Sequence, residues 1–515
     1  MRESFRNEPF TDFTRSDNIA DFQAALMSVE SQLGRTYGLK IGPDWLDTSV
    51  KANSLNPSHI AQTVGIVAQA DTELAHQAML AAAAAFEKWK RVLPAARARV
   101  LYKAAAILRR RRHEFSAWLV YEAGKNWAEA DADTAEAIDF MEFYGREMER
   151  LSEQQPLVPL YGEHNELIYL PLGVGVIIPP WNFPLAIMAG MTMASVVAGN
   201  TVVLKPASAA PVVAAKFMEL LEEAGLPDGV VNYLPGAGSQ IGDFLVEHPM
   251  TRFIGFTGSK EVGLRIHEKA AARQQDGKWL RRVIAEMGGK NTIIVDEDAD
   301  LDAAAEAIAS SAFGYSGQKC SACSKAVIHT SVYEDVVERV VERVKSLKMG
   351  KAMEQSSAMG PVIDERAYRN ILDYIEKGRT EGGLIHGGGK GDSSGYFIEP
   401  TIFKDVAPSA CIAQEEIFGP VLAFIRADNF DAALDIANNT EYGLTGAVIS
   451  RNRNRLEQAR AEFHVGNLYF NRKCTGALVG AHPFGGFNMS GTDSKAGGRD
   501  YLLLFLQPKV VSERF

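Results

Sequence analysis

Apolar positions in the first part of the chain recur every three to four places, the spacing of amphipathic helices. Residues 1–50 are otherwise polar and mixed, and we expect them to form an arm that lies on the body and carries no chemistry. The predicted helices are Ile19–Leu33 in this arm, then Asp71–Trp89, the helical region Pro94–Glu122, and Ala128–Arg150.

From about Gly162 the pattern changes to short apolar runs that alternate with helical stretches. This alternation predicts a parallel sheet with helices on both faces, and such sheets bind ligands beyond the carboxyl ends of their strands. The predicted strands are Glu166–Tyr169, Gly173–Ile178, Thr201–Lys205, Val230–Leu234, Phe253–Phe256 and Arg282–Ala285. The predicted helices are Leu185–Gly199, Val212–Glu223, Ile241–Val246 and Lys260–Ala272.

A second alternation of strands and helices begins after Gly289 and predicts a second α/β domain with its own core. Its predicted strands are Thr292–Val295, Ala326–His329, Phe397–Phe403, Val421–Ile425, Gly446–Ile449 and Gly466–Phe470. Its predicted helices are Leu301–Gly314, Tyr333–Leu347, Glu365–Glu381, Phe430–Asn438 and Arg453–Phe463.

The composition describes a globular protein and narrows its partners. Of the 515 residues, 46% are hydrophobic and 23% are charged, and this length suits two or three domains. The net charge of −10 argues against nucleic acid as a partner, because no global basic field is available to neutralise phosphates. The basic run Arg109–Arg112 continues a helical pattern, so we expect a solvated helix face there.

Cysteine usage and the apolar stretches bear on location. Four cysteines in a chain of this length favour a reducing compartment without a disulfide framework. The first ten residues lack the apolar run of a signal peptide, and Leu185–Gly199 is too short and too weakly apolar to span a bilayer. We therefore expect a cytoplasmic protein without a membrane segment.

The loop Ser316–Ser324 offers a candidate nucleophile, Cys320, among small residues. Its neighbour Cys323 completes a CxxC spacing, but the two further ligands of a zinc site and the context of a redox pair are missing. No metal is therefore expected, and Cys323 is expected to pack in the core. A nucleophilic thiol needs an electropositive or hydrogen-bonding environment.

Two residues elsewhere could assist such a thiol. Glu286 ends a predicted strand at the junction of the two α/β regions, where partial burial would raise its pKa and suit it to act as a general base. The alternative is an ion pair with a neighbour such as Lys290. Asn182 lies in a turn stiffened by prolines, and a fixed amide N–H there suits an oxyanion hole, although an Asx-turn is the alternative.

Three features could bind the phosphates or ribose of a cofactor. Gly236–Gly242 follows a strand, but its spacing is one residue too long for GxGxxG, and a tight turn is the simpler interpretation. In Phe256–Gly263 a strand leads through Gly258 and Ser259 into a helix, which would aim N–H groups at an anion; a capping serine is the alternative. Lys205, at a strand end, suits a ribose or phosphate contact or is a solvated lysine.

Together, these motifs resemble the aldehyde dehydrogenase superfamily over nearly the whole chain. The segments that carry the resemblance are, in order, PPWNFP, LKPAS, FTGSKEVG, EMGGKN, GQKC, EEIFGPV and PFGGFNMSG. The long N-terminal arm, ADTAEAIDFMEFY, GQKCSACS and the segment Thr475–Gly480 resemble the branch that oxidises L-glutamate γ-semialdehyde to L-glutamate in proline breakdown. No proline dehydrogenase region accompanies them, which is typical of the monofunctional bacterial type.

The resemblance implies an α/β protein with the aldehyde dehydrogenase fold. A Rossmann-like NAD-binding domain with the N-terminal arm would span residues 1–160 and 173–288, and an α/β catalytic domain would span 289–472. Residues 161–172 and 490–515 would form a small β oligomerisation element, in which Lys509–Val511 could pair with Glu166–Tyr169 and reach another subunit. The expected assembly is a homodimer or a larger homo-oligomer.

The resemblance also assigns catalytic roles. Cys320 would be the nucleophile that adds to the aldehyde, and Asn182 with the Cys320 backbone N–H would hold the oxyanion. After hydride passes to the nicotinamide, Glu286 would activate the water that hydrolyses the thioester.

NAD is the expected cofactor. By resemblance Lys205 would meet the adenosine ribose, Gly258–Gly263 would lie by the pyrophosphate, and Glu416 with Phe418 would hold the nicotinamide ribose. Many relatives carry a glutamate at position 208 that repels a 2′-phosphate, and Ser208 would not, so some use of NADP is expected. The full set of predicted cofactor residues is Ile178, Pro180, Trp181, Lys205, Ser208, Gly238, Gly258, Ser259, Gly263, Gly288, Glu416 and Phe418.

The expected substrate is a small molecule with a carboxylate and an ammonium far from its aldehyde. Ser321 and the backbone N–H groups around Gly476 and Ala477 would bind the carboxylate as a neutral nest without a buried cation. Phe183 and Phe484 would wall the aliphatic part, with core packing as the alternative, and Glu136 would line the channel. The rival interpretations are another small semialdehyde, whose anchor would include arginine, a CoA-dependent relative without need of Glu286, and a structural protein that kept the fold.

Overall fold

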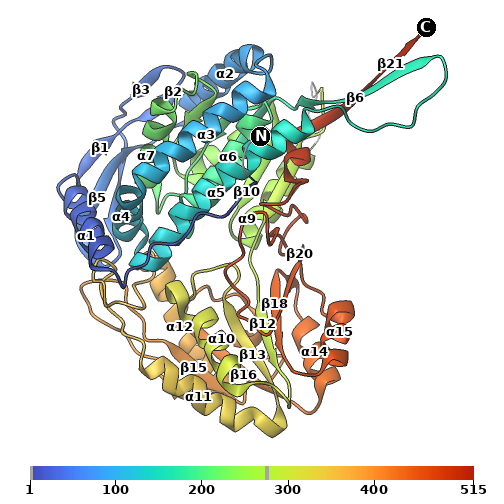
Figure 1. The fold of residues 1–515 in the computed structure, drawn as a ribbon. Helices are drawn as coiled ribbons and strands as arrows, with labels where there is room; N and C mark the ends of the chain where they lie inside the picture. The colour runs from blue at the N-terminus through green and yellow to red at the C-terminus, as the bar shows by residue number, and fades with distance from the viewer. Residues whose placement is uncertain (1–3, 273–277) are drawn as a thin grey trace.

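The protein, described here from a computed structural model covering residues 4–272 and 278–515, has two α/β bodies and a projecting β-ribbon (Figure 1). The first body holds the blue and green segments up to residue 288, and the second holds most of the yellow and orange segments after it. The first three residues of the predicted arm lie outside the described residues. The predicted α/β class is confirmed.

The sheet of the first body has seven strands in the order β11-β10-β7-β8-β9-β2-β3, and β11, β10, β7, β8 and β9 are parallel. Residues 39–46, predicted to belong to a separate arm, instead supply its antiparallel edge, because their strands are too short for a pattern to appear. The strands are β2 (Leu39–Ile41), β3 (Asp44–Leu46), β7 (Val174–Ile178), β8 (Thr201–Leu204), β9 (Val231–Tyr233), β10 (Thr251–Thr257) and β11 (Arg282–Glu286).

Helices cover both faces of this sheet, as predicted. The predicted helical region Pro94–Glu122 is two helices that meet at Arg111, whose φ of −100° and ψ of 19° leave the helical range. The helices are α1 (Ser16–Glu30), α2 (Thr72–Trp89), α3 (Pro94–Arg110), α4 (Arg112–Ala123), α5 (Trp127–Leu151), α6 (Ala186–Val197), α7 (Pro211–Glu223), α8 (Asp243–Glu247) and α9 (Lys260–Ala271). A further sheet, unpredicted, has the order β1-β5-β4, with β1 (Arg35–Tyr37), β4 (Lys51–Asn56) and β5 (His59–Ala68).

A buried carboxylate connects two of these helices. Glu122 in α4 accepts hydrogen bonds from the backbone N–H groups of Val212 and Val213, at 2.8 and 2.7 Å, in the first turn of α7. The first N–H groups of a helix have no partner within it, so a buried helix start needs such acceptors. Glu122 therefore fixes α7 to α4 in the interior of the first body.

The second body has its own seven-stranded sheet, in the order β14-β15-β16-β13-β12-β18-β19, parallel except at β14. Its strands are β12 (Asn291–Val295), β13 (Cys323–His329), β14 (Gly383–His386), β15 (Thr401–Lys404), β16 (Val421–Ala427), β18 (Thr445–Ile449) and β19 (Asn467–Phe470). Its helices are α10 (Leu301–Phe313), α11 (Tyr333–Lys345), α12 (Glu365–Glu381), α13 (Cys411–Gln414), α14 (Phe430–Asn438) and α15 (Arg453–Glu462).

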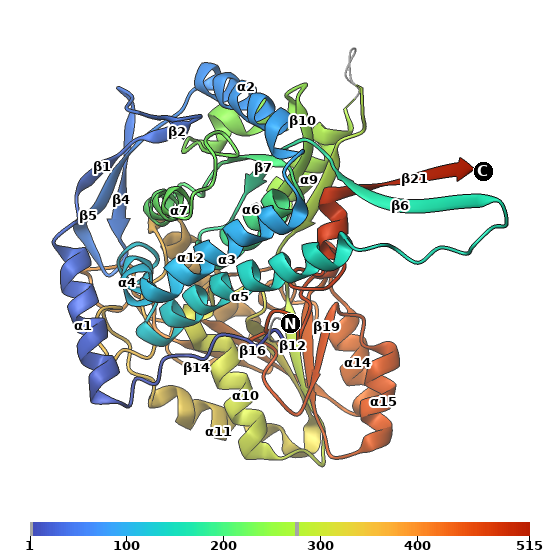
Figure 2. The same cartoon turned by 45° about the horizontal axis from the view of Figure 1, so that its top comes forward.

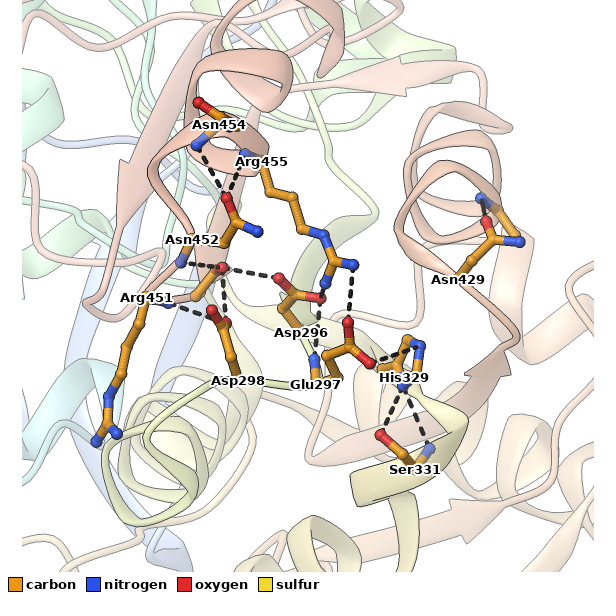
Figure 3. A network of polar contacts seen from close by, with 12 residues as sticks. Asp296, Glu297, Asp298, His329, Ser331, Asn429, Arg451, Asn452, Asn454 and Arg455 are labelled. Atoms are coloured by element: carbon orange, nitrogen blue, oxygen red, sulfur yellow. Dashed lines mark hydrogen bonds and ion pairs between the residues drawn. The ribbon is translucent and has the colours of Figure 1, made fainter.

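A polar network holds α15 against the end of β12 (Figure 3). Arg455 of α15 donates to the buried carboxylate of Asp296 and, at 2.8 Å, to Glu297. Asp296 also accepts from Ser450 Oγ at 2.8 Å, and Asn452 caps the start of α15. The network therefore fixes the end of β12 relative to α15.

The β-ribbon consists of β6 (Glu163–Pro171) and β21 (Leu506–Arg514), which pair antiparallel along their whole length. It projects from the first body (Figure 2). The predicted pairing of Lys509–Val511 with Glu166–Tyr169 is confirmed. The paired strand begins only at Leu506, whereas residues 501–505 form a buried 3-10 turn in the core of the first body. A further two-stranded pair consists of β17 (Tyr442–Gly443) and β20 (Phe487–Asn488).

Candidate active site

A cavity of about 530 Å³ is lined by residues of both bodies. Two catalytic candidates and every predicted substrate residue line it, so the fold brings together side chains from α5, the turn after β7, β11, the loop after α10 and the segment after β19. These residues are Glu136, Phe183, Glu286, Cys320, Ser321, Gly476, Ala477 and Phe484.

The cavity contains a thiol beside a carboxylate. Cys320 Sγ lies 3.9 Å from Glu286 Oε1, within reach of a sulfur hydrogen bond. The loop before Cys320 turns through two left-handed residues, Tyr315 (φ 51°) and Ser316 (φ 54°). Their hydroxyls donate to the carbonyls of Ala123 and Gly360, each at 2.7 Å, so tertiary contacts hold this uncommon backbone and fix the thiol's position.

The surroundings of the thiol are hydrogen-bonding and acidic, not electropositive. Burial raises the pKa of Glu286 to about 8, against the smaller lowering effects of Lys495 and Cys320. Burial, and then the carboxylates of Glu286 and Glu416, raise the pKa of Cys320 well above 9. The thiol therefore keeps its proton in this state, and the nearest carboxylate oxygen that could accept this proton is Glu286 Oε1.

Asn182 points at the loop that carries the thiol. It is buried, and its side-chain Nδ2 donates to the carbonyl of Gln318 at 3.0 Å, two residues before Cys320. An amide NH₂ has two hydrogens, so this bond orients the group and leaves a second donor. An Asx-turn would bond Asn182 to its own turn, and the contact across to Gln318 favours the oxyanion role.

Lys290 does not pair with Glu286. In the described part of the chain the Lys290 ammonium is buried without a hydrogen-bond partner, and burial lowers its pKa to about 7. Of the two interpretations of Glu286, an ion pair with Lys290 is therefore wrong, and the carboxylate faces the thiol instead.

Four predicted cofactor residues lie at the same edge of the first sheet. Ile178 ends β7 beside Phe256 of β10, and the Lys205 N–H, after β8, donates to Ile177 O at 2.9 Å. The Gly258 N–H donates to Glu286 O at 3.1 Å, and Ser259 caps α9. Parallel strands thus deliver these residues to their carboxyl ends, where such sheets bind dinucleotides.

The Lys205 ammonium has capacity for a ligand. It is buried, its one hydrogen bond within the described residues is to Pro206 O at 3.2 Å, and burial lowers its pKa to about 8. Gly238 lies against it, with an added Cβ 4.0 Å from Lys205 Cε. The exposed Ser208 follows in the next loop. A cation with unused donors suits ribose hydroxyls, so these residues fit the adenosine half of NAD.

Glu416 occupies the other end of this edge. Its Oε1 accepts from the Gly289 N–H at 3.0 Å, and burial raises its pKa to about 7. A Cβ added at Gly288 would lie 2.0 Å from Glu416 Oε2, so only glycine admits the carboxylate. Phe418 adopts a φ of 55° and packs edge-on against Trp181, next to Pro180, with ring centroids 5.4 Å apart. This arrangement fits a ribose held by Glu416.

Gly263 has a packing reason for being glycine. A Cβ there would lie 2.3 Å from Met287 Sδ, so the absence of a side chain lets α9 approach the sheet. Its proximity to pyrophosphate stays a prediction.

The end of the cavity where we expected a neutral nest for the carboxylate also carries cationic side chains. Gly476 has a φ of 76°, and Arg472 Nη2 donates to the carbonyls of Thr475, at 2.8 Å, and Gly476. Cationic side chains also line the cavity, where sequence reasoning placed none: Lys319, Arg472 and Lys473. Lys319 is paired with Glu129 at 2.6 Å. Lys319 and Arg472 are half-buried and Lys473 is exposed, so the anchor without a buried cation stays a prediction.

Other lining residues also escaped the sequence analysis. Lys319 adjoins Cys320 in GQKC, a signal that could have identified it. Phe10 and Thr11, from the arm expected to carry no chemistry, line the same cavity, and no local pattern marks them. Lys125 Nζ, which is paired with Asp133 at 2.9 Å, lies 3.6 Å from the centroid of the Phe183 ring.

Among residues 4–272 and 278–515, no three His, Cys, Asp or Glu side chains gather as metal ligands would. Over the same ranges, no helix combines the length and apolar character needed to cross a membrane.

The two sheets and the thiol–carboxylate cavity between them define a class of α/β enzymes that react through cysteine, and comparison with known proteins agrees. The aldehyde dehydrogenase family model matches residues 45–511, and the chain belongs to this family. The predicted superfamily is thereby confirmed.

Individual relatives cover the full chain. The 1-pyrroline-5-carboxylate dehydrogenases of Geobacillus thermodenitrificans and Bacillus subtilis are 62% and 59% identical to it over 515 residues, which is 100% of both chains in each case. A solved structure of 1-pyrroline-5-carboxylate dehydrogenase from Thermus with bound NAD superposes with a TM-score of 0.98 at 53% identity, covering 100% of both chains.

Proposed function

We propose that this protein oxidises L-glutamate γ-semialdehyde, formed from 1-pyrroline-5-carboxylate, to L-glutamate with NAD, the second step of proline degradation. The observation that carries the proposal is one cavity that joins a thiol–carboxylate pair to an anion-binding end with Lys319, Arg472 and Lys473. Full-length relatives named for this activity, at about 60% identity, support the same substrate and cofactor.

The first step is addition of the thiol to the aldehyde. Cys320 Sγ attacks the carbonyl carbon while its proton passes to Glu286, 3.9 Å away. The carbonyl oxygen becomes negative, and the second hydrogen of the Asn182 amide with the Cys320 N–H binds it. One such donor is worth about 3 kcal/mol in comparable sites.

NAD, when bound, supplies the hydride acceptor. Lys205 and Glu416 are the residues that would hold its two riboses. Loss of hydride from the tetrahedral adduct on Cys320 leaves a thioester. Glu286 gives the proton that it took from Cys320 to solvent, and then takes a proton from the water that attacks the thioester. It returns this proton to the departing sulfur, so that glutamate is released and the thiol is restored.

The charge at the far end of the cavity selects the substrate. Ser321 with the N–H groups of Gly476 and Ala477 would hold the carboxylate, and Arg472 and Lys473 add positive potential. A smaller semialdehyde that carries a carboxylate is the second candidate, because the same cations would attract it. Phe183 and Phe484 enclose the methylene chain between the two ends.

The direct test is NADH formation at 340 nm from 1-pyrroline-5-carboxylate and NAD. We expect turnover by the wild type and at least a ~10³-fold loss in Cys320→Ala, because no other group lining the cavity is a comparable nucleophile. Full activity of Cys320→Ala, or a wild type that prefers a shorter semialdehyde, would contradict the proposal. NADP in place of NAD should give weaker but measurable activity, since Ser208 does not repel a 2′-phosphate.

We also propose that the protein is a cytoplasmic homo-oligomer. The ribbon exposes apolar side chains, among them Val510 and Val511, and its tip carries Tyr161 fully exposed. A two-stranded ribbon is marginal by itself in water, so docking on a second copy would stabilise it. Four cysteines without a disulfide suit a reducing compartment.

A further inference from the structure

The N-terminal segment Phe5–Thr11 crosses from α5 to the far end of the cavity. Phe10 and Thr11 line that cavity, although this part of the chain belongs to neither sheet. Thr11 is tied to α5 through Asp131, which accepts from its N–H at 2.8 Å and from its Oγ1 at 2.6 Å. The same carboxylate is paired with Arg112, so the segment is held by a buried charge cluster.

Asn7 is the link between this segment and the loop Thr475–Gly480. Its Nδ2 donates one hydrogen to Asp139 Oδ2 at 2.8 Å and the other to Val479 O at 2.9 Å. The neighbouring Glu8 N–H donates to the second oxygen of Asp139 at 2.7 Å. Both hydrogens of the Asn7 amide are therefore used to join α5 to the loop.

A second contact lies next to the first. Gly480 has a φ of 78°, and an added Cβ there would lie 3.3 Å from the ring of Phe5. That ring packs edge-on against Phe143 of α5, with centroids 5.2 Å apart. The segment thus contacts the end of the loop twice, through the hydrogen bond from Asn7 to Val479 and through the ring of Phe5 beside Gly480.

At its other end the same loop is held by Arg472, through the carbonyls of Thr475 and Gly476. Gly476 and Ala477, which line the cavity, lie between the two points of attachment. Fixing both ends of the loop restricts the orientation of their backbone N–H groups, and hydrogen-bond donors discriminate only when their geometry is held.

We propose that the N-terminal segment is a positioning element for the anion-binding end of the substrate site, and that Asn7 is its positioning residue. Asn7 acts through Val479 and touches no substrate. The inference rests on the proposed function for its substrate, but its structural part, the tethering of the loop, does not.

The kinetic test compares two aldehydes in Asn7→Ala. With L-glutamate γ-semialdehyde we expect KM to rise about three- to ten-fold, the equivalent of one to two hydrogen bonds, with kcat within two-fold of wild type. With pentanal, which lacks the charged end, and with NAD, KM should not change. An unchanged KM for the semialdehyde, or the same rise for both aldehydes, would overturn the proposal.

Two further variants sharpen the comparison. Asn18→Ala removes another arm asparagine, whose Nδ2 donates to Asp12 O at 2.8 Å away from the loop, and should behave as wild type. Asn7→Asp cannot donate to Val479 and sets a carboxylate against Asp139, so its effect should exceed that of Asn7→Ala. Thermal melting of each variant separates loss of fold from loss of positioning.

Hydrogen–deuterium exchange tests the tether without any substrate. Amides of residues 475–480 should exchange faster in Asn7→Ala than in Asn18→Ala, and equal exchange would overturn the inference. A wild type that exchanges as expected but does not oxidise the semialdehyde would instead refute the proposed function and leave the tether supported.

Discussion

At the scale of single residues, the site relies on burial to set proton positions. Glu286 and Cys320 lie 3.9 Å apart, and both have pKa values raised by burial. A neutral thiol is protected from oxidation until an aldehyde arrives, because the thiolate is the reactive form. In the proposed mechanism, however, Glu286 must be ionised before each turnover, because it has to accept a proton.

This requirement predicts the pH dependence of activity. Since Glu286 must be ionised to accept a proton and its pKa is raised to about 8, kcat/KM should increase with pH up to about 8 and then level off. Stopped-flow or steady-state rates between pH 6 and pH 10 measure this dependence. Below the pKa of Glu286, kcat/KM should rise roughly tenfold per pH unit.

Glu136 provides the control, because burial raises its pKa to about 8 in the same cavity. Glu136→Gln should keep the alkaline rise, whereas Glu286→Gln should lose it along with most activity. If Glu136→Gln flattened the profile instead, the base would be misassigned.

A second residue-scale prediction concerns Asn182. Asn182→Ala removes the oxyanion donor and the contact to Gln318, so we expect kcat to fall ~10²–10³-fold. KM for NAD should stay within a few-fold of wild type, as the cofactor edge is separate from this amide. Asn182→Asp, similar in shape but without the N–H, should be at least as slow; near-normal kcat in either variant would remove Asn182 from the mechanism.

At the scale of elements, buried carboxylates connect segments that are distant in sequence. Glu122 joins α4 to α7, Asp131 and Asp139 join α5 to the arm, and Asp296 joins β12 to α15. Each accepts several hydrogen bonds, which compensates for the cost of burying its charge.

The Asp296 network can be tested by stability. Arg455→Ala would leave Asp296, whose side chain is inaccessible, without its guanidinium, and we expect a loss of about 2–3 kcal/mol in the free energy of unfolding. Chemical denaturation of the protein, followed by fluorescence, measures this free energy.

Arg453→Ala is the matched control on the same helix. Arg453 pairs with Glu457 on the surface, where such pairs contribute about 0–1 kcal/mol, so its removal should change stability little. Equal effects of the two substitutions would show that the Asp296 pair adds nothing beyond a surface contact.

The sequence predicted the elements of both sheets well, and missed those with little local pattern. Alternation located β7 to β11 in the first sheet and β12, β13, β15, β16, β18 and β19 in the second, because strands buried on both faces are apolar throughout, whereas β14 was missed. The strands of residues 35–68 were missed, since they are short or carry polar residues such as Asn53 and Gln62. Cys320, Glu286 and Asn182 could be named from their motifs, and the structure brings them to one place.

The rest of the cavity could not be predicted in the same way. Phe10 and Thr11 reach it only because α5 supplies Asp131 and Asp139 as partners, a tertiary fact with no signal in the arm itself. Arg472 and Lys473 lie just outside the segment Thr475–Gly480 that was considered for the anion site, so a wider window would have included them.

At the scale of the whole molecule, the two bodies enclose the chemistry and the ribbon reaches away from it. β6 and β21 lie outside the residues that line the cavity. The assembly that we propose for the ribbon and the catalysis that we propose for the cavity would therefore depend on different parts of the chain, so that one could be altered without the other.

Removal of residues 508–515 tests this separation. Leu506, whose carbonyl accepts from Arg282 at 3.1 Å, stays in place, while most of β21 is lost. We expect sedimentation velocity to show a smaller assembly, with kcat of the remaining species within a few-fold of the intact protein. Deletion of Phe515 alone is the control and should preserve the assembly, and an unchanged sedimentation coefficient in the longer deletion would exclude the ribbon as an interface.

The Asn7 bridge also has a consequence for synthesis. The residues that it joins, Asn7 and Val479, are separated by 472 positions, so Asn7 must wait for its partner until this stretch has been translated. At about 5–20 residues per second on the ribosome, the wait is roughly half a minute to a minute and a half. Asp139 emerges much sooner and can hold the arm meanwhile, so the anion-binding end of the cavity would be completed only after Val479 has emerged.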